Sequence, residues 1–226
     1  MKIVVLISAG AEWRSVKPLF PDVKLEKSPF GEWFITIINS KQFIFFHGGW
    51  GKISAAATTQ YVISNFQPDL LVNLGTCGGF EGRIETGVVI LVEKTIVYDI
   101  IEQMSDPDEA IAHYSTNIDL SWIKKPYPAS VYRGLLVSGD RDIVLEEIPM
   151  LISRFGAVAA DWESGAIAWV AERNGTRCLI LRGVSDLVGS TGGEAYGNYD
   201  LFQDRTNQIM QNLVSSLMVW LTLIIN

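Results

Sequence analysis

The chain has 226 residues, of which 48% are hydrophobic and 19% charged, and its formal net charge is −7 at pH 7. Chains of about 100 to 250 residues commonly fold around one core, so we expect one domain over residues 1–226. The acidic balance argues against a nucleic-acid partner or an anionic membrane, because an acidic surface repels both, and it favours a small-molecule partner.

The first predicted element is a strand at the start of the chain. Its apolar run, Ile3–Ser8, follows Lys2 and precedes small residues, so the opening superficially resembles a secretory signal peptide. The run from Ile3 to Ile7 is shorter than the roughly 7 residues of a signal core. We therefore interpret it as a first parallel strand followed by a loop.

Near-continuous apolar runs of strand length recur along the chain. They cover residues 3–8, 69–75, 87–99, 134–139 and 176–185. Runs without polar alternation favour strands covered on both faces, as in a mostly parallel sheet flanked by helices. Residues 34–49 instead predict a hairpin with Asn39 and Ser40 near its turn, which would make the sheet mixed.

Helical patterns lie between these runs, over residues 52–66, 146–155, 164–172 and 205–225. Because strands and helices alternate, the pattern favours the α/β class. The segment from Gln103 to Pro128 is polar and irregular, so we expect a long excursion or lid there. The C-terminal run Leu217–Ile225 is far below the roughly 20 residues of a membrane span and predicts a packed helix end.

Cysteine and histidine are scarce in this chain. Cys77 and Cys178 lie far apart with no CxxC motif, and His47 and His113 make no recognisable metal spacing with them. We therefore expect a reduced, cytoplasmic protein that binds no metal and needs no cofactor.

Polar or glycine-rich sequence follows several of the predicted strands, where ligands gather in open α/β sheets. Glu12 follows the first strand and Asp186 follows the run that ends near Ser185. Taken singly, Glu12 could be a first-turn glutamate favoured by the helix dipole, and Asp186 could cap a helix. Together with Glu163, they predict acids gathered at one edge of the sheet.

The segment NLGTCGGF, residues 73–80, carries three glycines that let a backbone pass close to a ligand. It does not match GxGxxG, and no GK[ST] follows it, so neither a dinucleotide site nor a P-loop is indicated. The alternative interpretation is an apolar loop tightened by glycine.

Four segments resemble the nucleoside phosphorylase and nucleosidase superfamily, and within it the 5′-methylthioadenosine/S-adenosylhomocysteine nucleosidases. They are GWGKISAAATTQYVISNFQPDLLVNLGTCGGF, GLLVSGD, ADWESGAIAWVA and LRGVSDLVG, in the family's order and at near-family spacing. The resemblance covers essentially the whole chain. It implies a three-layer α/β/α sandwich around a twisted mixed β-sheet, a homodimer, and a purine nucleoside and water as reactants.

The resemblance also implies the residues that carry the chemistry. Asp186 would be the general acid that protonates N7 of the purine, Ser185 would help hold its carboxylate, and Glu12 would orient the attacking water. This division parallels inverting glycosidases, whose two carboxyl groups are roughly 6.5 to 9.5 Å apart to admit water. Asp186 must be protonated near neutral pH, so we expect surroundings that are apolar or that hydrogen-bond its acid form.

The remaining matches concern substrate binding. Glu163 would accept hydrogen bonds from the ribose hydroxyls, with Trp162 along the sugar where many relatives carry methionine. Thr76 and Arg182 match positions near the water and the ribose, and the backbone around Ile143 matches the strip that recognises the adenine edge. The neighbouring acid at position 161 has no implied substrate role and could cap a helix or pair with Arg182.

The resemblance leaves two candidates for the attacking group, water and phosphate. Phosphorylases of this superfamily hold phosphate with an arginine at the position of Asn73, and a neutral amide does not replace its bidentate grip. The stretch from Lys27 to Trp33 also offers no arginine for a neighbouring subunit. Water is therefore the expected nucleophile, while Arg14, near another phosphate position, keeps a phosphorylase as the alternative.

The choice of nucleoside also stays open. Asp142 stands where relatives place an aromatic residue against adenine, which removes roughly 0.5 to 1.5 kcal/mol of stacking and leaves another or a modified purine nucleoside possible. The 5′ group is expected in an apolar pocket around Val97–Met104, partly built by the partner subunit, with Tyr98 and Met104 as contacts. A non-catalytic nucleoside-binding relative is the alternative from another class, and the presence of both expected acids disfavours it.

Overall fold

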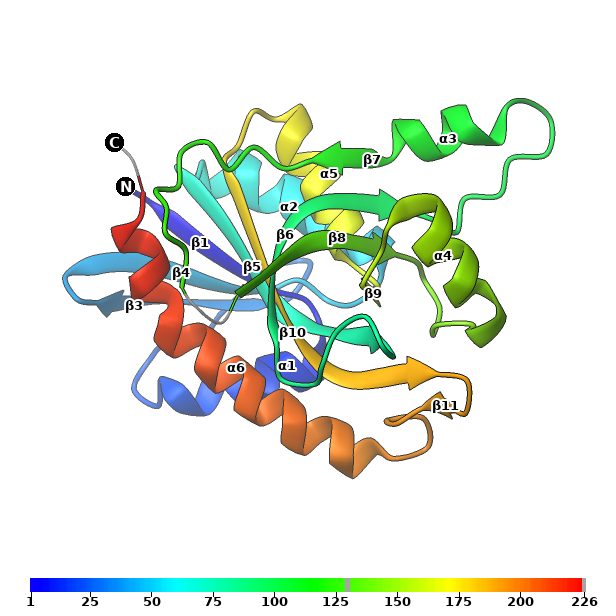
Figure 1. Ribbon diagram of the computed structural model, residues 1–226. Coiled ribbons are helices and arrows are strands. Elements are labelled where there is room, and N and C mark those ends of the chain that lie inside the picture. Colours follow the sequence, from blue (N-terminus) through cyan, green and yellow to red (C-terminus); the bar gives the residue numbers. More distant parts are fainter. Residues whose placement is uncertain (129–130, 225–226) are drawn as a thin grey trace.

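The computed structural model describes residues 1–128 and 131–224. Within this part of the chain, eleven strands form one mixed sheet with helices on both faces (Figure 1). The expected α/β class, a three-layer α/β/α sandwich around a twisted mixed sheet, is confirmed.

The first strand, β1 (Ile3–Ile7), lies inside the sheet between two parallel neighbours, β4 (Lys41–His47) and β5 (Leu70–Phe80). β4 forms the predicted antiparallel hairpin with β3 (Glu32–Ile38). The two residues of its turn, at positions 39 and 40, both have positive φ angles, of 47° and 63°, as tight two-residue hairpins require. The short strand β2 (Glu26–Lys27) pairs with β3 at the edge.

Beyond β5 the sheet closes on itself. Each strand of a ring pairs with the next, in the order β5, β10 (Cys178–Gly189), β6 (Val89–Val97), β8 (Val131–Ser138) and β9 (Ala159–Asp161), and β9 returns to β5. Two short strands extend this ring, β11 (Gly192–Gly193) on β10 and β7 (Ser115–Asn117) on β6.

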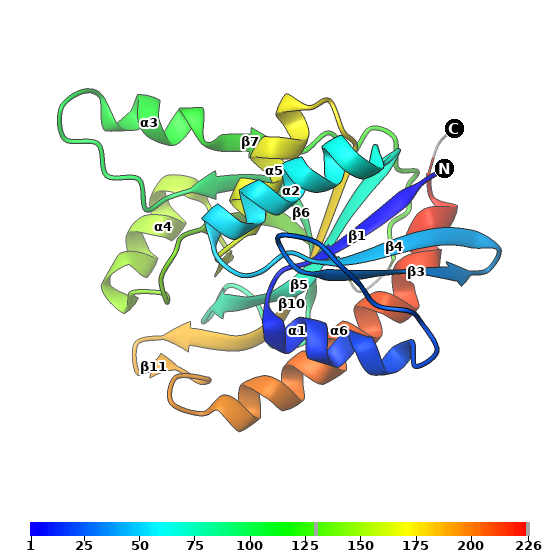
Figure 2. The ribbon, with the colours of Figure 1, turned by 180° about the vertical axis from the view of Figure 1, so that it is seen from behind.

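Helices cover the sheet in two groups, which the views from front and back separate (Figures 1 and 2). One face carries α1 (Gly10–Val16) and α6 (Tyr199–Thr222), and the other carries α2 (Lys52–Phe66) and α5 (Ser164–Arg173). Alternate residues of β1 join the two apolar clusters, so the strand is buried on both sides. This two-sided burial explains its unbroken apolar sequence.

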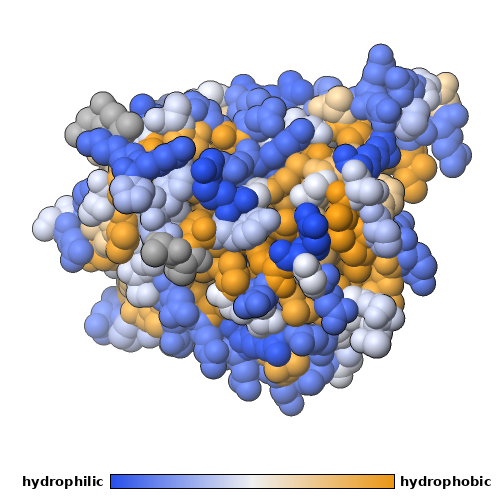
Figure 3. Space-filling model, viewed as in Figure 1, coloured by the Kyte–Doolittle hydropathy of each residue, from blue (hydrophilic) through white to orange (hydrophobic). Residues whose placement is uncertain are grey.

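Two further helices lie beside the ring, α3 (Pro107–His113) and α4 (Ile148–Phe155), with a 3-10 turn, Leu145–Glu147, before α4. Between α6 and α4, apolar side chains reach the surface of the molecule (Figures 1 and 3). A third apolar cluster lies at this end, with Phe80, Ile143 and Val188 among its members.

Some element boundaries differ from the predictions. The glycine-rich segment 73–80 is not a loop, because it continues β5 and pairs with β10 as far as Phe80. Asp186 likewise lies within β10 rather than after it, next to an irregularity between Val184 and Asp186. A continuous ladder with a long neighbour outweighs the weak strand preference of glycine.

The structure also differs from the predictions in residues 103–128 and at the start of the last helix. The region 103–128 contains α3 and β7, so it is not irregular throughout. The last helix begins at Tyr199 rather than at Arg205, since Asn198 caps it by accepting a hydrogen bond from the Leu201 N–H at 3.3 Å. It ends at Thr222, and the predicted end at residue 225 lies outside the described residues. Within residues 1–128 and 131–224, no helix is both long and apolar enough to span a bilayer.

Candidate active site

A cluster of buried charges lies where β5, β10, α1 and the start of α5 meet. Arg182 of β10 is at its centre, is fully buried, and approaches three carboxylates. Its Nη2 atom lies 2.9 Å from Oδ2 of Asp161 and 3.8 Å from Oε2 of Glu163. Its Nη1 atom lies 3.7 Å from Oε1 of Glu12 and has no hydrogen-bond partner in the protein. The arrangement compensates a buried charge and leaves one guanidinium N–H group free to bind a ligand.

Two neighbours explain how the guanidinium fits there. Nη2 of Arg182 also donates to the Asn73 side chain at 2.8 Å, and Nε donates to Oγ of Ser164 at 2.8 Å. The group passes directly over Gly75, where a Cβ atom would lie 1.7 Å from Nη1. A side chain at position 75 would therefore displace Arg182. Asn73 thus helps to hold this arginine.

Glu12 lies in the first turn of α1, and its carboxylate is turned inward. Oε2 accepts a hydrogen bond from the Ala9 N–H at 3.1 Å, which helps to cap the helix. Oε1 accepts from the Thr76 N–H at 2.6 Å and from the Thr76 hydroxyl at 3.0 Å. Burial raises the pKa of Glu12, while Arg182 and these hydrogen bonds oppose the rise. Glu12 is thus both a helix-terminal residue and a member of the buried cluster.

The two acids on either side of Trp162 have different surroundings. Asp161, at the end of β9, accepts hydrogen bonds from the Ser164 N–H and from the Ser138 hydroxyl, so it caps α5 as well as pairing with Arg182. Glu163 instead accepts from the Gly51 N–H at 3.0 Å. Burial raises the pKa of Glu163 to about 8, and Asp161 adds to the rise while Arg182 opposes it.

Trp162 is half-buried, and its ring lies 5.4 Å from that of Trp50 at an angle of 44°. Trp50 stands just before α2 and is 65% exposed. The loop that carries it is tied to Glu163 through the neighbouring Gly51 N–H. The two indoles therefore form an aromatic surface beside the buried carboxylate of Glu163.

Asp186 belongs to a second group, further along β10. Its Oδ1 accepts a hydrogen bond from the Ser185 hydroxyl at 2.6 Å. Burial raises the pKa of Asp186, against the opposing effect of Ser185, and Glu194 adds to the rise. Arg182 is opposite Gly75 and Asp186 is opposite Gly78 in the ladder, which separates the two groups by roughly 10 Å along the strands.

Ile143 lies near this second group, on the connection between β8 and α4. Its side chain covers Gly78, where a Cβ atom would lie 2.8 Å from Cδ1. Its carbonyl accepts a hydrogen bond from the Tyr196 hydroxyl at 3.0 Å. Sequence inspection does not single out Tyr196, because a tyrosine in a short polar loop carries no pattern that indicates a contact with a residue so far away in the chain.

The predicted site residues therefore form two neighbouring groups on one pair of strands. One group contains Glu12, Thr76, Glu163 and Arg182 with Trp162 at its edge, and the other contains Ser185, Asp186 and Ile143. Arg14, considered for phosphate, is exposed and donates to the Tyr199 hydroxyl at 2.7 Å. Among the described residues, no three His, Cys, Asp or Glu side chains are arranged to hold a metal ion.

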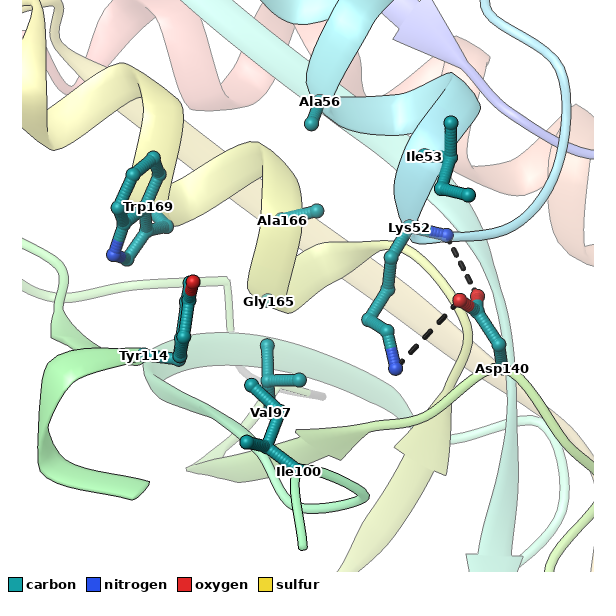
Figure 4. A pocket seen from close by; sticks show the side chains of 10 residues that line it. All are labelled: Lys52, Ile53, Ala56, Val97, Ile100, Tyr114, Asp140, Gly165, Ala166 and Trp169. Carbon is teal, nitrogen blue, oxygen red and sulfur yellow. Dashed lines mark hydrogen bonds and ion pairs between the residues drawn. The ribbon is translucent and has the colours of Figure 1, made fainter. Parts of the chain in front are cut away.

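A separate apolar cavity of about 360 Å³ opens beside α5 (Figure 4). Its lining residues come from α2, α5, the residue between α3 and β7, and the ends of β6 and β8. None belongs to the two groups above: Lys52, Ile53, Ala56, Val97, Ile100, Tyr114, Asp140, Gly165, Ala166 and Trp169. Val97 and Ile100 fall in the region predicted for the 5′ substituent. The other two residues named there do not line it, because Tyr98 is buried in the third apolar cluster and Met104 is 95% exposed.

Comparison with known proteins identifies the family of this chain. The model of the phosphorylase superfamily matches residues 2–218. A 5′-methylthioadenosine/S-adenosylhomocysteine nucleosidase of Marinomonas sp. (strain MWYL1) is 24% identical over 214 residues, which cover 88% of this chain and 92% of that protein.

Two solved structures share the fold. A mutant of the Helicobacter pylori nucleosidase MTAN with 5′-methylthioadenosine in its active site superposes with a TM-score of 0.76 at 20% identity, covering 96% of this chain and 97% of that one. The futalosine hydrolase of the same organism gives a TM-score of 0.77 at 20% identity over the same shares of both chains. The resemblance drawn from the sequence motifs is confirmed, and the chain belongs to the phosphorylase superfamily.

Proposed function

We propose that this protein hydrolyses the N-ribosidic bond of a purine nucleoside, with 5′-methylthioadenosine or S-adenosylhomocysteine as substrate and adenine as a product. The observation that carries the proposal is the pair of neighbouring groups on β5 and β10. One holds the buried acid Asp186, and the other holds Glu12 against Thr76. The names of the relatives support the same reaction class.

Asp186 is the general acid in this proposal. Breaking the bond between C1′ and N9 leaves the electron pair on the purine, and a proton delivered to N7 neutralises it. A carboxyl group can deliver that proton near neutral pH only if its pKa is raised. Burial has this effect on the pKa of Asp186, while the Ser185 hydroxyl fixes the orientation of the carboxyl group.

Glu12 directs the water. Its Oε1 atom is held by the Thr76 N–H and hydroxyl groups, and as a carboxylate it accepts a hydrogen bond from water. The water oxygen attacks C1′ of the oxocarbenium-like sugar, and Glu12 takes the proton that the water loses. The products are the free base and the free sugar. The proton that Asp186 gives to N7 is balanced by the proton that Glu12 takes from water.

The sugar is bound by Glu163 and Arg182. The carbonyl oxygen of the Glu163 carboxyl group accepts hydrogen bonds from the ribose hydroxyls, and the free N–H group of Arg182 Nη1 donates to an oxygen of the sugar or of the water. Trp162 packs along the ring, with Trp50 behind it. These groups hold the sugar while the bond at C1′ stretches.

Water rather than phosphate is the proposed nucleophile because of the charges around Arg182. The carboxyl groups of Glu12 and Asp161 already face this guanidinium, and as carboxylates they would repel a phosphate anion at the distances involved. Arg14 points to Tyr199 instead of into this cluster. The phosphorylase alternative is therefore disfavoured.

A second candidate substrate comes from the fold comparison. A relative of similar structure is a futalosine hydrolase, and the residue at position 142 is an exposed aspartate rather than the aromatic residue expected against adenine. A nucleoside other than 5′-methylthioadenosine is accordingly the alternative substrate within the same reaction.

We further propose a homodimer in the cytoplasm. Trp50, Ile53, Ile101 and Met104 expose large apolar side chains, and Ile53 also lines the cavity beside α5 (Figure 4). A second copy of the chain would cover these side chains and complete the 5′ pocket. Both cysteines are free thiols, which supports a reducing compartment.

The test is an assay for free base with a panel of nucleosides. 5′-Methylthioadenosine, S-adenosylhomocysteine, adenosine, inosine and futalosine are each incubated with the protein, with and without phosphate. The proposal expects adenine release from the 5′-thio nucleosides that does not depend on phosphate. Release only in the presence of phosphate would establish a phosphorylase, and release from none of them would refute the proposed activity.

A further inference from the structure

Tyr196 joins two loops next to Asp186. It lies in the short segment between β11 and α6, and its hydroxyl donates to the Ile143 carbonyl at 3.0 Å, on the connection between β8 and α4. The tyrosine is partly exposed, and its ring packs over Gly193. No role of Tyr196 follows from the reaction proposed above.

Two contacts and one electrostatic effect link this tyrosine to the acid. The Ile143 side chain covers Gly78, the residue opposite Asp186 in the ladder between β5 and β10. The N–H group of Ala195, the residue before Tyr196, approaches the Asp186 carboxyl group. Asp142 and Asp186 both contribute to raising the pKa of Tyr196 to about 12, after the effect of its own burial. The Tyr196 hydroxyl, the Ile143 carbonyl and the Asp186 carboxyl group therefore border the same space.

The positions of N7 and C6 in a purine suggest a role for these groups in base recognition. This inference rests on the proposed function. In a purine, N7 and the substituent at C6 lie on the same edge of the base. If Asp186 protonates N7, the polar groups beside Asp186 face the C6 substituent. Recognition at C6 decides between 6-amino purines, which donate hydrogen bonds there, and 6-oxo purines, which accept them.

The hydrogen bond to Ile143 determines what Tyr196 can offer at this edge. A phenol has one proton to donate, and Tyr196 gives it to the Ile143 carbonyl. The phenolic oxygen is then left as an acceptor, beside a carbonyl that is also an acceptor. We propose that the Tyr196 hydroxyl is a specificity-determining group that selects a 6-amino purine over a 6-oxo purine. The lone pairs of a 6-oxo group would be repelled by these two acceptors unless the hydrogen bond from Tyr196 to the Ile143 carbonyl were broken.

The test compares 5′-methylthioadenosine with 5′-methylthioinosine, which differ in the groups at C6 and N1 of the base. The variant Tyr196→Phe keeps the ring and removes the hydroxyl. We expect the wild-type protein to favour the adenine nucleoside, and the ratio of the two kcat/KM values to fall by about fivefold in Tyr196→Phe, the effect of one neutral hydrogen bond. If the tyrosine only holds the two loops together, both values fall equally, and an unchanged ratio overturns the inference.

Tyr199→Phe is the matched control. Its hydroxyl accepts from Arg14 and donates to Gln203 on α6, so its removal should leave the ratio unchanged. The binding of free adenine and free hypoxanthine, measured by calorimetry, separates this inference from the proposed reaction. Release of base from neither nucleoside refutes the hydrolase, and the binding preference still decides for Tyr196. A shift toward hypoxanthine in Tyr196→Phe supports the selection, and an unchanged preference overturns it.

Discussion

Replacing Glu163 by glutamine removes one ionisable group from the buried cluster without changing the shape of the side chain. In the folded protein, burial raises the pKa of this carboxyl group from 4.5 to about 8, and Arg182 only partly opposes the rise. Each pKa unit corresponds to about 1.4 kcal/mol, so ionising Glu163 in the folded state costs several kcal/mol. Glutamine cannot ionise and does not incur this cost.

The sign of the pH effect follows from where the proton is held. Between pH 4.5 and about 8 the folded protein keeps Glu163 protonated, whereas the unfolded chain has lost that proton. The free energy of unfolding therefore decreases through this window as the pH rises. The contribution is favourable below the window and is lost once the pH exceeds the folded-state pKa.

Denaturant unfolding at a series of pH values measures this dependence. In the wild-type protein, the free energy of unfolding should contain a decline between pH 4.5 and 8 that is absent from Glu163→Gln. Glu172→Gln, at the exposed end of α5, is the control and should retain the decline. Equal slopes in the wild-type protein and Glu163→Gln would refute the account of this carboxyl group.

The same variant tests the sugar-binding role. Below its pKa of about 8 the Glu163 carboxyl group is neutral, and a neutral hydrogen bond contributes about 0.5 to 1.5 kcal/mol, so kcat/KM for the nucleoside should fall by about two- to tenfold. An unchanged kcat/KM would contradict the assignment of Glu163 to the ribose hydroxyls.

Three further results are expected. Thr76→Val removes the hydroxyl bond to Glu12 but keeps the N–H bond, so kcat should fall by about two- to tenfold, and a larger loss than in Glu12→Gln would contradict this assignment. The dependence of kcat/KM on pH should be bell-shaped, because Glu12 must be ionised and Asp186 must be protonated, and burial raises the pKa of both. A profile without an alkaline decline would contradict Asp186 as the acid. Ile53→Glu places a charge on the apolar surface beside α2 and should convert dimers to monomers in analytical ultracentrifugation, unlike the exposed control Glu172→Gln, and a dimer that persists would contradict that interface.

The sequence predicts the layers of this fold well, because a strand that is buried on both faces has an unbroken apolar sequence. The unbroken apolar run of β1 and the turn at Asn39 and Ser40 are examples. The extent of β5 is not predicted, because residues 73–80 have glycines typical of a loop, and pairing with β10 makes them strand. The early start of α6 is missed because its first turns are polar and only the cap at Asn198 marks them.

The candidate site is predictable to a similar degree. Glu12, Glu163 and Asp186 follow from motif positions, and pairing of Asp161 with Arg182 was one of two options, both of which the structure contains. The passage of the guanidinium over Gly75 and the bond from Tyr196 to Ile143 depend on packing between distant segments. No local pattern in the sequence encodes such contacts.

The most direct test of the proposed chemistry is the release of adenine from 5′-methylthioadenosine by the wild-type protein and by Asp186→Asn in phosphate-free buffer. Asparagine keeps the size of the side chain and the hydrogen bond with Ser185, but it has no proton to give to N7. A general acid contributes about 100- to 10,000-fold in rate, so the account predicts a loss of at least that lower factor in kcat, with a folded variant. Near-normal turnover by Asp186→Asn would contradict it.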